Sequence, residues 1–167
     1  MRKKYILICL SLLAALFIYV FYRTGRTLVN EMLVHVISVE TYTRLKAHIV
    51  VAWPLNDIII YSLPEALWIF CITLTSKPFY IKLNNGRFYC IFIPLIFCFG
   101  LEILQLFHIT RGRFDFMDIG LSVIFWILAA FVLKDGAEKR NIFTRPDTNM
   151  VICLASYIIV YLAHVFK

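Results

Sequence analysis

Residues 88–133 read FYCIFIPLIFCFGLEILQLF, then HITRGRFD, then FMDIGLSVIFWILAAFVL. The first and last segments are almost wholly apolar and have 20 and 18 residues, close to what an α-helix needs to cross the hydrocarbon core of a bilayer. The eight residues between them carry two arginines and an aspartate. This stretch therefore predicts two membrane helices joined by a short polar loop.

The rest of the chain has the same character. It is 62% hydrophobic and 16% charged, with a mean hydropathy of +0.82, whereas soluble domains are roughly 45–50% apolar. The longest connection outside the apolar stretches is 23–57, which leaves no room for a soluble catalytic domain. We expect one all-α integral membrane domain over 1–167, a bundle of about five transmembrane helices, with spans at 5–22, 58–76, 88–107, 116–133 and 150–166.

The N-terminus begins with Arg2-Lys3-Lys4 and an apolar run that ends at Tyr22. No small-residue cleavage site follows this run, so an uncleaved first span is favoured over a secretory signal peptide. Five spans put the chain ends on opposite sides of the membrane. Lys and Arg number ten on the N-terminal side and seven on the other, so the positive-inside rule predicts a cytoplasmic N-terminus.

The connection 23–57 contains an apolar stripe at helical spacing, formed by Val29, Met32, Leu33, Val36 and Ile37. The stripe predicts an amphipathic helix that lies on the outer membrane surface or packs against the bundle. Further along, Trp53 reads as an interfacial anchor, and Asn56 or Asp57 can cap the second span.

The charge and the cysteines exclude other classes of protein. The net charge of +7 comes from Lys and Arg at the ends of apolar runs, not from a basic stripe, so no nucleic-acid partner is expected. The five cysteines lie inside the predicted spans without CxxC spacing, and His35 has Glu31 four residues before it but no third ligand nearby. On this basis we assign no metal site and no cofactor.

Three carboxylates fall within the predicted spans: Glu65, Glu102 and Asp118. A carboxylate in the hydrocarbon costs several kcal/mol on insertion scales, so each needs a partner or a purpose. The alternating topology places all three in the outer half of the membrane, at similar depth. Pro64 and Pro94, inside the second and third spans, predict kinks that favour a pocket near them.

Further polar residues lie at the same depth. Gln105 shares a helix face with Glu102, Ser122 shares one with Asp118, and Asp115 is placed to cap the fourth span. The loop between the third and fourth spans also carries Arg111 and Arg113. Arginine forms bidentate pairs with carboxylates and phosphates, so this loop can neutralise Glu102 and Asp118 or present positive charge to an anionic ligand. The candidate site comprises Glu65, Glu102, Gln105, Arg111, Arg113, Asp115 and Asp118.

The order Glu102-x-x-Gln105, Gly112-Arg113, Asp115 and Asp118 resembles the VanZ-like family of bacterial membrane proteins. The matching core covers residues 100–118, and the alignment with its span layout extends over about 58–133. The chain departs from the family pattern at Ser122, where many members carry Asn, and in lacking the glycines that follow there. The resemblance implies a multi-pass protein of the bacterial cytoplasmic membrane, with a possible link to glycopeptide-type antibiotic resistance; it implies no reaction.

Three functions are compatible with these residues. The site can bind an anionic envelope lipid or envelope precursor; it can act on a lipid-linked phosphate, with Glu102 or Asp118 as general base; or Glu102 and Arg113 can form a structural ion pair in an accessory subunit of a membrane complex. We prefer binding, because no nucleophile is evident in the sequence, and we make no assignment as an enzyme.

Overall fold

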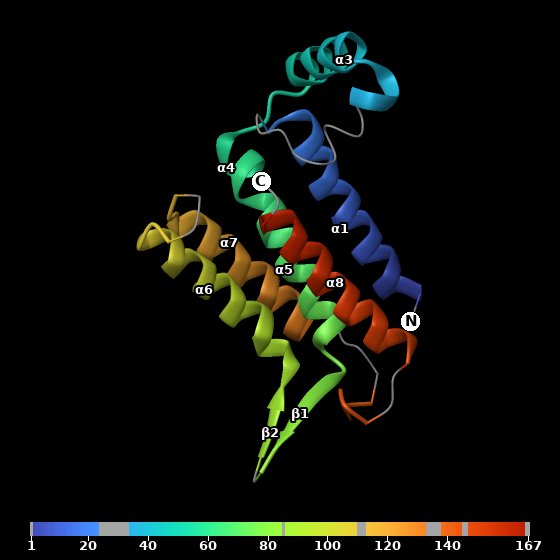
Figure 1. The fold of residues 1–167 in the computed structure, drawn as a ribbon, viewed down its shortest axis with the longest axis vertical. Helices are drawn as coiled ribbons and strands as arrows, with labels where there is room; N and C mark the ends of the chain where they lie inside the picture. The colour runs from blue at the N-terminus through green and yellow to red at the C-terminus, as the bar shows by residue number, and fades with distance from the viewer. Residues whose placement is uncertain are drawn as a thin grey trace.

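The computed structural model describes residues 2–23, 34–84, 86–109, 113–132, 138–144 and 147–165. Most of these residues are helical. The bundle consists of α1 (Arg2–Phe21), α5 (Leu63–Ser76), α6 (Ile93–Leu106), α7 (Phe116–Ile127) and α8 (Thr148–Val165). These helices run alternately up and down (Figure 1). We name the end that carries α3 (Val39–Ala52) and α4 (Asp57–Tyr61) the acidic end, and the end that carries the strands the hairpin end.

Helix α5 is the centre of the bundle and contacts α1, α6, α7 and α8. Its side chains are nearly all buried from Pro64 to Ser76. Several buried contacts are polar: the hydroxyls of Thr75 and Ser156 are 2.9 Å apart, as are those of Ser76 and Tyr157. Hydroxyl groups that bridge closely packed helices are typical of membrane bundles.

The predicted span 58–76 is wrong in detail, because a break at Ser62 divides it into α4 (Asp57–Tyr61) and α5. Asn56 caps α4, as expected: its side chain accepts a hydrogen bond from the Ile58 amide at 3.2 Å. The predicted proline kinks are also wrong. Pro64 and Pro94 lie in the first turns of α5 and α6, where the backbone N–H that proline lacks would have no helical partner anyway.

The other predicted boundaries need smaller changes. The span expected at 88–107 begins later, because a short 3₁₀ turn, η1 (Cys90–Phe92), leads into α6. The indole N–H of Trp126 donates to the carbonyl of Ile91 in this turn at 2.8 Å. The span expected at 116–133 is α7 followed by a π-helical turn, η2 (Leu128–Val132). Helices α1 and α8 match the first and last spans, starting three and two residues earlier than expected.

The mostly helical structure is consistent with the all-α prediction, and a small sheet at the hairpin end adds strands that the sequence did not predict. Strand β1 (Phe79–Leu83) pairs antiparallel with β2 (Gly86–Tyr89), with Tyr80 opposite Tyr89 and Lys82 opposite Arg87. A two-residue strand, β3 (Arg140–Asn141), pairs parallel with β1. Residues 88 and 89, which were expected to begin a span, belong instead to a hairpin that projects beyond the helices (Figure 1).

The surface helix expected at 29–37 is described only in its last part, where residues 34–37 are helical; residues 29–33 lie outside the described residues. A further surface helix that was not predicted, α3, occupies Val39–Ala52 with none of its residues buried. Three hydrogen bonds attach this region to the end of α1. They join the Tyr42 hydroxyl to the Val20 carbonyl at 2.6 Å, the Lys46 ammonium to the Arg23 carbonyl at 2.8 Å, and the Tyr22 hydroxyl to the Trp53 carbonyl at 2.6 Å.

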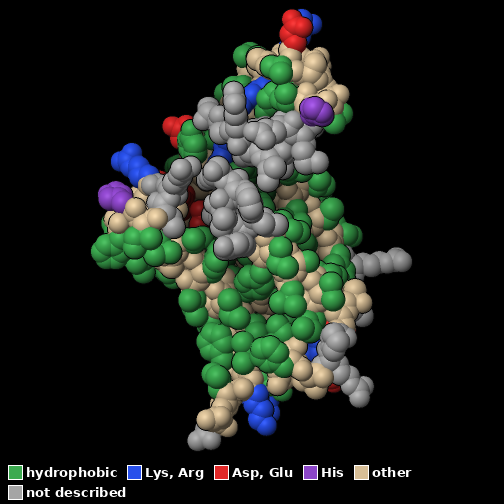
Figure 2. Space-filling view, viewed as in Figure 1, with side chains coloured by type: hydrophobic (Ala, Val, Ile, Leu, Met, Phe, Trp, Pro, Cys, Tyr) green, Lys and Arg blue, Asp and Glu red, His purple; other side chains and the backbone are tan. Residues whose placement is uncertain are grey.

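The outer faces of the bundle helices are apolar (Figure 2). Large hydrophobic side chains are exposed on each of α1, α6, α7 and α8, among them Leu10, Leu13, Ile96, Phe99, Ile124, Phe131, Leu154 and Ile158. By length and composition, α1 is long and apolar enough within the described residues to cross a membrane, with a mean hydropathy of 2.3 over Lys3–Phe21. The other apolar helices of the described residues are shorter, at Leu63–Ser76, Cys90–Leu106, Phe116–Val132 and Thr148–Ile159.

Candidate functional site

Three carboxylates from three helices meet near the acidic end. Glu65 lies in the first turn of α5, Glu102 in the last turns of α6 and Asp118 in the first turn of α7. One oxygen atom of each lies within 4.8 Å of the others. Glu102 is fully buried, and the other two are half-buried. These residues form the acidic cluster, and their juxtaposition follows from the antiparallel order of the three helices.

The local backbone holds Glu102 in place. Its Oε2 accepts a hydrogen bond of 3.1 Å from the backbone N–H of Asp115, which joins the end of α6 to the start of α7. Asp115 is exposed and is the N-cap of α7, because its side chain accepts from the Met117 amide at 2.9 Å. This cap was expected from the sequence.

The end of α6 is shaped by a Schellman turn. His108 adopts a positive φ of 56°, its N–H donates to the Gln105 carbonyl at 2.9 Å, and the Ile109 N–H donates to the Leu104 carbonyl at 2.9 Å. The turn satisfies two carbonyls that the helix would otherwise leave without partners, and it redirects the chain across the acidic end. The His108 side chain is exposed, and the residue contributes to the turn through its backbone.

The basic residues of the predicted site do not pair with Glu102 in the part of the chain that the structure describes. Arg111 lies outside the described residues. Arg113 is exposed, and its guanidinium makes no ion pair or hydrogen bond with any described residue, so the predicted Glu102–Arg113 ion pair is not formed. Gln105 is half-buried on α6, three residues beyond Glu102. Arg113 is therefore left facing solvent or a ligand.

Two residues of α1 or its end also belong to this region, and the sequence analysis missed them. The guanidinium of Arg23 donates to the Tyr19 hydroxyl at 2.9 Å and to the Tyr61 carbonyl at 2.8 Å, and it lies 4.4 Å from the centre of the Tyr19 ring. The Tyr19 ring also packs against Trp68 of α5, with the two ring centres 6.5 Å apart. The predicted depth in the membrane could have identified Arg23, because it follows the end of the first span on the side where the carboxylates were expected.

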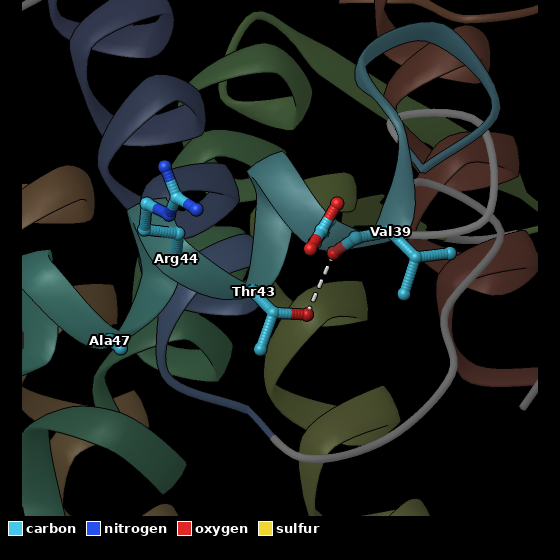
Figure 3. Close-up of a pocket in the computed structure, with 5 residues that line it drawn as sticks. Val39, Thr43, Arg44 and Ala47 are labelled. Carbon is cyan, nitrogen blue, oxygen red and sulfur yellow. Dashed lines mark hydrogen bonds between the residues drawn. The ribbon is translucent and has the colours of Figure 1, made fainter.

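A separate depression lies on the surface helix (Figure 3). Its lining consists of Val39, Glu40, Thr43, Arg44 and Ala47, all from α3. The Thr43 hydroxyl donates to the Val39 carbonyl at 2.7 Å, one turn earlier, so it is already satisfied. Because one exposed helix supplies every wall, this depression lacks the converging groups of a binding site.

Comparison with protein-family models, with curated proteins and with solved structures finds no match to this chain. The resemblance to the VanZ-like family stays a prediction from the motif at 100–118.

Proposed function

We propose that this chain is a VanZ-like, multi-pass integral membrane protein of the bacterial cell envelope, and that its acidic end binds the headgroup of an anionic lipid or envelope precursor. The observation that carries this proposal is Arg113, an exposed guanidinium with no partner among the described residues, close in the chain to the acidic cluster. Asp115, two residues further on, donates directly to Glu102. Since consecutive Cα atoms are 3.8 Å apart, Arg113 begins within about 8 Å of that contact.

The distribution of polarity supports a membrane location. Exposed apolar side chains cover the outer helices, while the interior of the bundle contains hydroxyl–hydroxyl contacts between α5 and α8. A soluble helical protein shows the opposite arrangement, with polar outer faces. Continuous apolar exposure of this extent is characteristic of a surface that meets lipid or another protein.

Aromatic residues support it as well. Trp53 and Tyr61 are exposed at the acidic end, and Tyr80 and Tyr89 are partly exposed at the hairpin end. Tyr and Trp are enriched where a membrane protein meets the two headgroup layers. The alternating directions of the five bundle helices are consistent with five spans, and the excess of Lys and Arg on the N-terminal side favours a cytoplasmic N-terminus.

The test is lipid analysis of purified protein. Wild type, Arg113→Gln and Arg87→Gln are extracted in the same mild detergent, and retained lipids are measured by mass spectrometry beside the melting temperature. Arg87 is a matched control, because it is an exposed arginine at the hairpin end. We expect an anionic lipid to be enriched in wild type and in Arg87→Gln, and to be reduced at least fivefold in Arg113→Gln with the melting temperature unchanged. Equal lipid retention in all three proteins would refute the proposal.

A further inference from the structure

The acidic cluster has the composition of a cation site. Its three members supply only carboxylate oxygens and come from three different helices, and one oxygen of each lies within 4.8 Å of the others. Hard divalent cations such as Ca²⁺ and Mg²⁺ prefer oxygen ligands of this kind. A cation held between such carboxylates lowers the repulsion among them.

Two buried oxygen atoms without a hydrogen-bond partner among the described residues provide an independent observation. Glu102 is fully buried, and while its Oε2 accepts from the Asp115 backbone N–H, its Oε1 makes no hydrogen bond with the described part of the chain. Ser122 is also fully buried, and its hydroxyl has no hydrogen-bond partner there either. It lies one turn along α7 from Asp118, on the same helix face. Buried polar atoms nearly always have a partner, so these oxygens indicate a missing one within the cluster.

We propose that Glu65, Glu102 and Asp118 bind one divalent cation of about the size of Ca²⁺, with the Ser122 hydroxyl as a further candidate ligand. Three atoms that lie within 4.8 Å of one another have a common point no more than about 2.8 Å from each. Ca²⁺–oxygen distances of about 2.3–2.6 Å are closer to this upper limit than Mg²⁺–oxygen distances of about 2.0–2.1 Å, which favours Ca²⁺.

Cation binding by these carboxylates does not require that a lipid binds at the acidic end. A cation there also offsets the negative charge that would otherwise oppose an anionic headgroup, and it retains coordination positions for a phosphate oxygen or for water. This role of the cation in binding a headgroup rests on the proposed function. Cation binding is therefore tested in detergent without added lipid, so that failure of one proposal is distinguishable from failure of the other.

The experiment uses the full chain, stripped with EDTA and desalted, and titrated with CaCl₂, MgCl₂ or MnCl₂ while the melting temperature is followed. We expect saturable stabilisation by Ca²⁺, with a rise of roughly 5–10 °C at a hundredfold excess over Kd. The rise should be absent in Glu102→Gln and Asp118→Asn. It should be retained in Glu40→Gln, which changes an exposed acid on α3.

A second measurement needs only wild type and so does not depend on whether the variants fold. Trp68 lies three residues after Glu65 on α5, on the same helix face, where it can sensitise Tb³⁺ luminescence. We expect Tb³⁺ emission on excitation of tryptophan, and its displacement by Ca²⁺. Wild-type protein that shows neither thermal stabilisation by any of the three cations nor Ca²⁺-sensitive Tb³⁺ emission would overturn the proposal.

Discussion

Replacing Glu102 separates the charge of the acidic cluster from its packing. Glu102→Gln keeps an oxygen that can accept from the Asp115 amide and removes one negative charge, whereas Glu102→Ala removes both the charge and the acceptor. Both variants therefore remove the same repulsion between carboxylates. Only Glu102→Ala also loses the hydrogen bond to Asp115 and leaves a cavity. Measured in chelator, this comparison isolates each contribution.

The magnitudes follow from the geometry. Two full charges 4.8 Å apart repel by about 3.5 kcal/mol at an effective dielectric constant near 20. Exchanging a charged hydrogen bond for a neutral one costs about 1 kcal/mol, so Glu102→Gln should be as stable as wild type or more stable. Glu102→Ala should be about 3 kcal/mol less stable than Glu102→Gln, from about 1 kcal/mol for the lost hydrogen bond and about 2 kcal/mol for the cavity at a fully buried position.

The assay is thermal unfolding in detergent at neutral pH with EDTA, followed by tryptophan fluorescence. For a chain of this size the difference between Glu102→Ala and Glu102→Gln corresponds to roughly 6–12 °C in melting temperature. A Glu102→Gln variant that melts as early as Glu102→Ala, with both well below wild type, would refute the reasoning. Such a result would mean that a fixed positive charge of the protein balances Glu102.

Three further predictions concern other contacts. Tyr157→Phe should lower the melting temperature by a few degrees, because it removes the hydroxyl 2.9 Å from Ser76, a contact of about 0.6–1.5 kcal/mol. Asp115→Ala should cost about 1 kcal/mol in the same assay through loss of the α7 cap. The Arg140 guanidinium beside Asp147 lowers the pKa of that carboxyl, so the contact stabilises α8 above the unfolded pKa, about 3.9, and is lost as pH falls through the lower folded value. Amide exchange at the start of α8 should therefore accelerate in acid, and should be insensitive to pH in Asp147→Asn after correction for intrinsic exchange.

Hydropathy predicted the helical class and the approximate ends of α1, α7 and α8, because long apolar runs leave few alternatives to helix. The predicted depth in the membrane also grouped Glu65, Glu102 and Asp118, which the structure brings together. This depth could be predicted because the rise per residue of a helix is constant and successive spans alternate in direction. The same estimate for the basic residues includes Arg23.

The hairpin and the break at Ser62 were missed because hydropathy does not separate a buried strand from a helix end. The sequence Asn84-Asn85-Gly86 is a turn signal between two aromatic-rich stretches, and it indicates β1 and β2 when read on its own. The Schellman turn that ends α6 was also missed, because residue spacing does not predict a positive φ at the non-glycine residue His108.

The central claim is that the acidic cluster lies at the non-cytoplasmic end of a five-span membrane bundle. Sided labelling of Arg113→Cys and Lys82→Cys tests it most directly, since both positions are exposed and lie at opposite ends of the bundle. With a membrane-impermeant maleimide applied from the non-cytoplasmic side, we expect Arg113→Cys to react on intact cells and Lys82→Cys to react only after permeabilisation. Labelling of both from the same side, or the reverse pattern, would contradict the account.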